Sequence, residues 1–208
     1  SNTAINSAGG AFTWTSLSVD TSVHGGAGGN GGTGATTGGN GGNGGAAGTL
    51  TRGISLLGIR GMVATIGDVV LRSNATGGDA GFGGEGTNAS GVQGNGGNAV
   101  SGPIALEARE RFGVPTQRGS LILDSVYGES IATGGNSAIA GTSTAGGDNS
   151  FRLYNGDATI GSFQFVIQGD NPSSVSDYIA VVDGSATIGG TFSFETSNAL
   201  ALYANRTN

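Results

Sequence analysis

The sequence predicts an all-β protein, a parallel β-helix of about five coils with about 28 residues in each coil. Three observations predict this fold: apolar strand-like runs recur along the chain, a short motif precedes most of them, and three glycine-rich tracts interrupt the repeat at one phase. Runs of Val, Ile, Leu, Phe and Thr bounded by Gly, Asn and Asp are typical of strands and turns.

The strand-like runs have a constant spacing once the glycine-rich tracts are removed. Five apolar triplets mark the repeat: Leu17–Val19, Val69–Leu71, Leu121–Leu123, Phe163–Phe165 and Phe192–Phe194. Their spacings are 52, 52, 42 and 29 residues, and these become 28, 30, 27 and 29 without the tracts Gly25–Gly48, Gly77–Asn98 and Gly134–Asp148. A constant period with insertions at one phase favours a stacked solenoid, whereas a β-sandwich, the alternative, gives no reason for it.

A second marker has the same phase. The motif ATIG occurs at Ala64–Gly67, Ala158–Gly161 and Ala186–Gly189, and we expect Thr116–Gly119 to hold the same place before Leu121. Alternating runs at Ile104–Leu106, Phe151–Leu153 and Ile179–Val181 supply a middle strand. The segment Ile104–Phe112 also contains good helix formers, so a short strand followed by a helical turn is expected there.

Residues two apart in a strand face the same side, so the ends of each triplet should point into the core. The expected core residues are Leu17, Val19, Val69, Leu71, Leu121, Leu123, Phe163, Phe165, Phe192 and Phe194.

The first glycine-rich tract has a period of three residues. It reads GGAGGNGGTGATTGGNGGNGGA over Gly25–Ala46, with nine residues on each side of a break at Gly34–Thr37. This is the period of the polyproline II helix, and glycine on two of its three rows lets such helices pack backbone against backbone. We therefore expect the three tracts to project from one side of the solenoid and to pack as polyglycine II helices. A flexible linker is the alternative.

Composition excludes several classes of function. The 208 residues include 45 Gly, no Cys, 8 basic and 14 acidic side chains, for a net charge of −6. Without a basic cluster, no nucleic-acid partner is expected. The long uncharged stretches are Gly, Asn and Thr, so no membrane span is expected, and no signal-peptide pattern is visible. Thiol chemistry and Cys-based metal sites are excluded.

No catalytic, cofactor-binding or metal-binding residues are expected. The one histidine, His24, follows Asp20 by four residues and is expected to be an ordinary surface residue. Four acids lie in turns without an obvious pair: Asp124, Glu129, Asp157 and Asp183. The acids in GGDAGFGGEG and GGDNSF have the wrong spacing for a calcium-binding repeat. Glycosylation sequons at Asn74, Asn88 and Asn205 are expected by chance in this composition.

Two resemblances add to this interpretation. The segments ATIGGTFSF, GDATIGSFQF and GGDNSFRLYNG resemble repeats of bacterial surface adhesins of the filamentous-haemagglutinin and autotransporter-passenger type. That resemblance implies a secreted, non-enzymatic rod with a right-handed β-helix. The first tract resembles the Gly-Gly-Ala and Gly-Gly-Asn repeats of mycobacterial PGRS proteins and the polyglycine bundles of glycine-rich antifreeze proteins and phage tail-tip adhesins.

We therefore expect one β-solenoid domain over residues 1–208 that forms a structural or adhesive part of an extracellular bacterial fibre or cell-surface adhesin. Its expected partners are other copies, end to end or side by side, and a glycan or host-surface ligand. Two alternatives stay open. One is an ice- or glycan-binding module that uses rows of Thr and Asn, and the other is a β-helix enzyme acting on polysaccharides.

Overall fold

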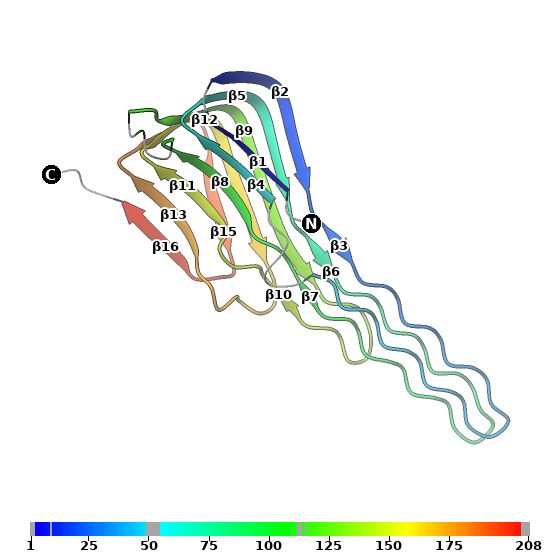
Figure 1. The fold of residues 1–208 in the computed structure, drawn as a ribbon. Helices are drawn as coiled ribbons and strands as arrows, with labels where there is room; N and C mark the ends of the chain where they lie inside the picture. Colours follow the sequence, from blue (N-terminus) through cyan, green and yellow to red (C-terminus); the bar gives the residue numbers. More distant parts are fainter. Residues whose placement is uncertain (1–2, 9, 49–54, 112–113, 115, 205–208) are drawn as a thin grey trace.

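The computed structural model describes residues 3–8, 10–48, 55–111, 114 and 116–204, and these form sixteen strands and no helix. Most strands belong to two parallel sheets that face each other (Figure 1). Sheet A has the order β1 (Thr3–Ala8), β4 (Ser55–Arg60), β8 (Ile104–Arg109), β11 (Ser150–Tyr154), β13 (Asp177–Val182) and β16 (Leu200–Ala204).

Sheet B contains β2 (Ala11–Asp20), β5 (Val63–Arg72), β9 (Gly119–Thr133) and β12 (Gly156–Gln168) in that order. Both β14 (Ser185–Ile188) and β15 (Phe192–Thr196) pair with β12. The chain visits sheet A and then sheet B in turn. We call each such pair of visits a passage, so that neighbouring strands in a sheet come from successive passages.

Four short strands lie where the glycine-rich tracts join the two sheets. They are β3 (Val23–His24), β6 (Ala75–Thr76), β7 (Ala99–Val100) and β10 (Ser143–Thr144). Strand β6 pairs with β3 and with the end of β9, and β7 pairs with β10. A small cluster of buried alanines fills this region: Ala47, Ala75, Ala99 and Ala132. The first two tracts extend from here as long hairpins to the same end of the molecule (Figure 1).

The main core lies between the two sheets, as the alternation of apolar residues predicts. Seven of the expected core residues are buried: Val19, Val69, Leu71, Leu121, Leu123, Phe163 and Phe165. Leu17 and Phe194 are partly buried against them. Phe192 lies on the core side, as expected, but it is 43% exposed. It lies on the last strand of sheet B and stacks on Phe163 at a centroid distance of 5.0 Å, with no later strand of the described chain over it.

The predicted strand register is right at both ends of sheet B and wrong in the middle. Leu17 pairs with Val69, and Phe163 pairs with Phe192. Leu121, however, pairs with Ala64 and Ala158, so it holds the place of the ATIG motif instead of following it. The expectation for Thr116–Gly119 is therefore also wrong.

A long corner explains this error. Nine residues, 110–118, separate β8 from β9, whereas two residues separate β4 from β5. Within this corner Arg111 forms an antiparallel bridge with Val114, and the described residues contain no helical turn. Strand β8 confirms the short strand expected from Ile104, whereas this bridge stands where a helical turn was expected to follow. Phe112 lies outside the described residues. No helix of the described chain is long and apolar enough to cross a membrane.

Candidate functional site

The glycine-rich tracts are held by backbone hydrogen bonds at every third residue. Within the first tract, the amides of Gly39, Gly42 and Gly45 donate to the carbonyls of Gly32, Gly29 and Gly26 at 2.7–2.8 Å. These bonds join the outgoing leg, residues 25–33, to the return leg, residues 38–46, on the two sides of the break at Gly34–Thr37.

The same spacing joins the first tract to the second. The outgoing leg donates from Gly25, Gly28, Gly31 and Gly34 to the carbonyls of Thr76, Asp79, Phe82 and Glu85. In the opposite direction, the amides of Gly78, Gly81 and Gly84 donate to the carbonyls of Gly45, Gly42 and Gly39. Each leg thus contacts more than one neighbouring leg, and we call this array of hydrogen-bonded legs the glycine lattice.

Glycine is required where the legs meet. A Cβ atom on Gly28 would lie 2.1 Å from the carbonyl oxygen of Gly42, and one on Gly81 would lie 2.0 Å from that of Gly29. Because the obstacle is backbone, any side chain at these positions would push the legs apart. The bonding pattern and this steric requirement both argue against a flexible linker.

The third residue of each triplet carries the side chains. The Oδ1 atoms of Asn30, Asn40 and Asn43 accept hydrogen bonds from the amides of Phe82, Val92 and Asn95 at 2.9–3.0 Å. Asparagine at these positions therefore adds side-chain bonds to the backbone bonds between the first two tracts.

One edge of this lattice is open. Gly26, Gly29 and Gly32 precede Gly78, Gly81 and Gly84 by 52 residues, the offset of the first two passages in sheet B. A Cβ atom on any of these three would meet nothing within 4 Å. Their amides have no hydrogen-bond partner in the described part of the chain, whereas the equivalent amides in the second tract are all bonded.

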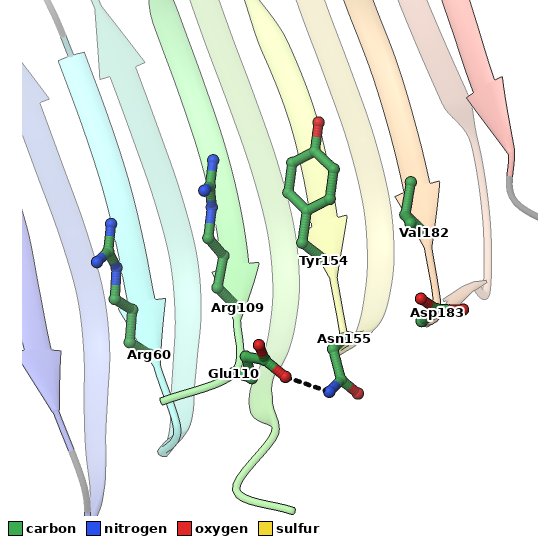
Figure 2. Close-up of a pocket in the computed structure, with 7 residues that line it drawn as sticks. All are labelled: Arg60, Arg109, Glu110, Tyr154, Asn155, Val182 and Asp183. Carbon is green, nitrogen blue, oxygen red and sulfur yellow. Dashed lines mark hydrogen bonds between the residues drawn. The ribbon is translucent and has the colours of Figure 1, made fainter. Parts of the chain in front are cut away.

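A second candidate site is a groove on the outer face of sheet A, with a volume of about 350 Å³. Figure 2 shows Arg60, Arg109, Tyr154 and Val182 side by side on β4, β8, β11 and β13. The strand register places them in one row: Arg60 pairs with Arg109, Arg109 with Tyr154, and Tyr154 with Val182. The corner residues Glu110, Asn155 and Asp183 complete the lining, and the Glu110 carboxylate accepts a hydrogen bond from Asn155 Nδ2.

The corners that line the groove depend on unusual backbone conformations. Asn155 and Asp183 have φ values of 47° and 50°. Asn and Asp tolerate this left-handed region better than most residues, because their short polar side chains bond locally. Asn155 and Asp183 therefore form tight corners directly after Tyr154 and Val182, the last residues of β11 and β13.

Arginine and tyrosine alternate over the outer face of sheet A. The Arg109 guanidinium lies 4.7 Å from the ring centre of Tyr154, and that of Arg152 lies 4.3 Å from the ring of Tyr178. Burial raises the pKa of Tyr178 to about 12, although the charge of Arg152 opposes the shift.

Carboxylates pair with two of the arginines on this face. Glu107 lies 2.6 Å from Arg109, and Asp148 lies 2.6 Å from Arg152. Arg60 has no hydrogen-bond or ion-pair partner among the described residues.

The four acids considered from the sequence do not form one cluster. Asp157 accepts two hydrogen bonds from Arg118, and the same guanidinium donates to the carbonyl of Asp183 at 2.8 Å. Burial would raise the pKa of Asp157, but hydrogen bonds from Ser185 and Arg118 outweigh it and lower the pKa. Glu129 instead accepts hydrogen bonds from Tyr127 and Asn74, and Asp124 is exposed. Both acids lie in strand β9 and not in the turns expected from the sequence.

The other residues singled out from the sequence lie apart. The Asp20 carboxylate accepts a bond from the Ser22 amide, and no bond joins it to the exposed His24 in the described chain. Asp79 accepts a bond from the Asn136 amide, and Asp148 pairs with Arg152. Asn74 is held by its bonds to Glu129 and Ile131, Asn88 lies at the tip of the second tract, and Asn205 lies outside the described residues.

Sequence reasoning did not identify the groove, because its members come from four passages. The available signal was an arginine or tyrosine at or near the end of successive apolar runs, in GIR, EAR and RLY. Within the described residues, no three His, Asp or Glu side chains gather in a way that could hold a metal ion. No family model, curated protein or solved structure matches the chain.

Proposed function

We propose that the chain is a short parallel β-helix with an attached polyglycine II bundle, and that it forms a non-enzymatic structural or adhesive segment of an extracellular bacterial fibre or surface adhesin. The observation that carries this proposal is the open edge of the first passage. There, both the sheets and the glycine lattice end in backbone groups that a further layer could bond.

A rod built in this way owes its stiffness to its backbone. Parallel in-register ladders run through both sheets from the first passage to the last, at about 4.8 Å per strand. The bundle beside them repeats its hydrogen bonds every third residue. Such a segment supports a mechanical role better than a role that needs moving parts.

The edge of the first passage has the properties of a stacking surface. Strands β1 and β2 are edge strands of the described sheets, and exposed sheet edges pair readily with another chain. Trp14 and Val23 are exposed on this passage. Residues 1–48 contain only Asp20 and His24 as ionisable side chains, so two copies would meet here with little charge repulsion, although the chain carries −6 overall.

The test is the assembly state of the full chain, measured by sedimentation velocity and negative-stain electron microscopy over a concentration series. We expect dimers or filaments that increase with concentration. The triple variant Gly26→Ala/Gly29→Ala/Gly32→Ala should fold, because each Cβ has free space, and should assemble less. Ala27→Val, which enlarges the neighbouring side-chain row, is the matched control. A monomer at every concentration, or unchanged assembly of the triple variant, would contradict the stacking role.

A second candidate function, ice binding, is favoured by one specific row on the outer face of sheet B. Thr13, Thr65, Thr159 and Thr187 lie in register on successive strands, with Ile122 between the second and the third. Thermal hysteresis of the purified chain tests this function directly. Ile122→Thr, which completes the row, should increase the hysteresis if this face binds ice.

A further inference from the structure

The groove on sheet A places two arginines against each other without an evident structural benefit. Arg60 and Arg109 are directly paired across β4 and β8. Like charges at paired positions of neighbouring strands are destabilising. Glu107 forms an ion pair with Arg109, but Arg60 has no ion-pair partner among the described residues. An anionic group bound between the two guanidiniums would remove this repulsion.

The composition of this face also indicates a binding surface. It carries three of the eight arginines (Arg60, Arg109 and Arg152) and three of the four tyrosines (Tyr154, Tyr178 and Tyr203). Tyrosine and arginine are enriched where proteins bind other molecules, because they offer a large contact area together with a polar end. The row from Arg60 to Val182 spans three strand steps, or about 14 Å, so it suits an elongated ligand.

The balance of charge narrows the ligand class. Ion pairs with Glu107 and Asp148 neutralise Arg109 and Arg152, so among the described residues Arg60 is the arginine of this face that has no carboxylate partner. The groove is also lined by the carboxylates of Glu110 and Asp183, which lie at its corner edge, whereas the guanidiniums of Arg60 and Arg109 point away from that edge (Figure 2). A nucleic acid needs several phosphate contacts for appreciable affinity. A single carboxylate, in contrast, can be bound by one guanidinium or between two neighbouring ones. The half-buried Tyr154 ring supplies a flat surface, and the corner residues Glu110, Asn155 and Asp183 give the groove a polar edge in which Asn155 Nδ2 already donates to Glu110.

We propose that this groove binds an acidic oligosaccharide, with a uronate carboxylate between Arg60 and Arg109 and a sugar ring packed against Tyr154 and Val182. The proposal extends the adhesive part of the proposed function by naming the ligand class. It does not depend on stacking of the first passage, which lies at the end of the molecule.

The test is calorimetric titration of the full chain with trigalacturonate, and with maltotriose as a neutral trisaccharide. We expect binding of the acidic sugar, at least tenfold weaker binding of the neutral one, and at least a tenfold loss in Arg60→Gln. Arg72→Gln is the matched control, because Arg72 lies 6.0 Å from the Tyr127 ring on sheet B, in a similar setting away from the groove. It should bind like the wild type.

A second variant separates the ring contact from the charge. Tyr154→Leu keeps an apolar side chain in the row and should weaken the binding of both sugars while leaving the preference for trigalacturonate unchanged. Three results would overturn the proposal: no heat of binding with trigalacturonate, equal affinity for both sugars, or full affinity in Arg60→Gln. Tighter binding of a single-stranded oligonucleotide than of trigalacturonate would also overturn it. None of these results bears on the assembly state, so the stacking proposal stands or fails separately.

Discussion

A Cβ atom on Gly81 would lie 2.0 Å from the carbonyl oxygen of Gly29, yet a Cβ atom on Gly29 itself would meet nothing within 4 Å. The two glycines occupy the same place in successive tracts and differ only in what lies over them. Gly81 is covered by the first tract, and Gly29 is the corresponding position of that first tract.

This difference predicts opposite effects of one substitution. Gly81→Ala should lower the free energy of unfolding by about 1–3 kcal/mol, because the added methyl group would displace the backbone of the first tract. Gly29→Ala should raise it by about 0.4–1 kcal/mol, because alanine has less freedom in the unfolded chain and φ at Gly29 is not positive. Urea unfolding at low protein concentration measures both values. Equal effects of the two substitutions would show that the tracts do not pack in this way.

Amide exchange should follow the three-residue period of the hydrogen bonds. The amides of Gly28 and Gly31 donate to the second tract and should exchange slowly, whereas those of Gly29 and Gly32 should exchange quickly in the monomer. In the return leg, both Gly41 and Gly42 donate, so neighbouring residues should be protected there. Exchange measured by NMR resolves this pattern. Uniformly fast exchange throughout the tract would indicate a flexible linker.

The side-chain bonds of the asparagines should contribute measurably. Asn43→Ala removes the acceptor for the Asn95 amide and should cost about 0.5–1.5 kcal/mol of folding free energy. Thr33→Ala is the matched control. Thr33 is also the third residue of a triplet, in the outgoing leg, and its side chain has no hydrogen bond among the described residues. Thermal unfolding measures the loss of stability in both variants. An equal loss in the two would contradict a stabilising role for the asparagine side-chain bonds.

Asp177 should make stability depend on pH. Its carboxylate is fully buried and accepts bonds from Asn149, Thr196 and Asn198. Burial raises the pKa of Asp177 above 3.8, although these bonds oppose the shift. The folded state therefore takes up a proton more readily than the unfolded state. The contribution of Asp177 to stability increases as pH falls through its raised pKa toward 3.8, and decreases as pH rises again.

The variant Asp177→Asn tests this prediction. It should lose about 1–3 kcal/mol at pH 7, because an amide nitrogen would face hydrogen-bond donors. The gap to the wild type should widen between pH 7 and pH 4, measured by urea unfolding at each pH. Asp124→Asn, at an exposed position, is the control and should keep the stability of the wild type at pH 7. A gap that narrows toward pH 4 would give the opposite sign for the pKa shift.

Gly128 should tolerate no side chain, for a reason unrelated to the tracts. A Cβ atom there would lie 2.5 Å from the Phe165 ring and 2.6 Å from Ile104 Cδ1, in the core between the sheets. Gly128→Ala should cost about 1–3 kcal/mol through overpacking. Gly189→Ala is the control, because its nearest neighbour would be 3.8 Å away. Equal melting temperatures of the two variants would contradict this packing.

The local features of this protein could be predicted from the sequence. Apolar alternation placed the strands and most of the core, since a period of two residues decides which side chains share a face. The three-residue period of Gly25–Ala46 marked both legs and the break between them, since it depends only on neighbouring residues.

The strand register and the groove could not be predicted, because they depend on contacts between distant parts of the chain. The register of β9 depends on the nine-residue corner before it. Spacings between apolar triplets do not show which residues between them belong to a corner and which to a strand. Arg60, Arg109 and Tyr154 are far apart in the chain and meet only because three strands pair in register. The open edge at Gly29 likewise became visible only by comparison with the covered Gly81, because identical glycines differ there in their neighbours and not in their sequence.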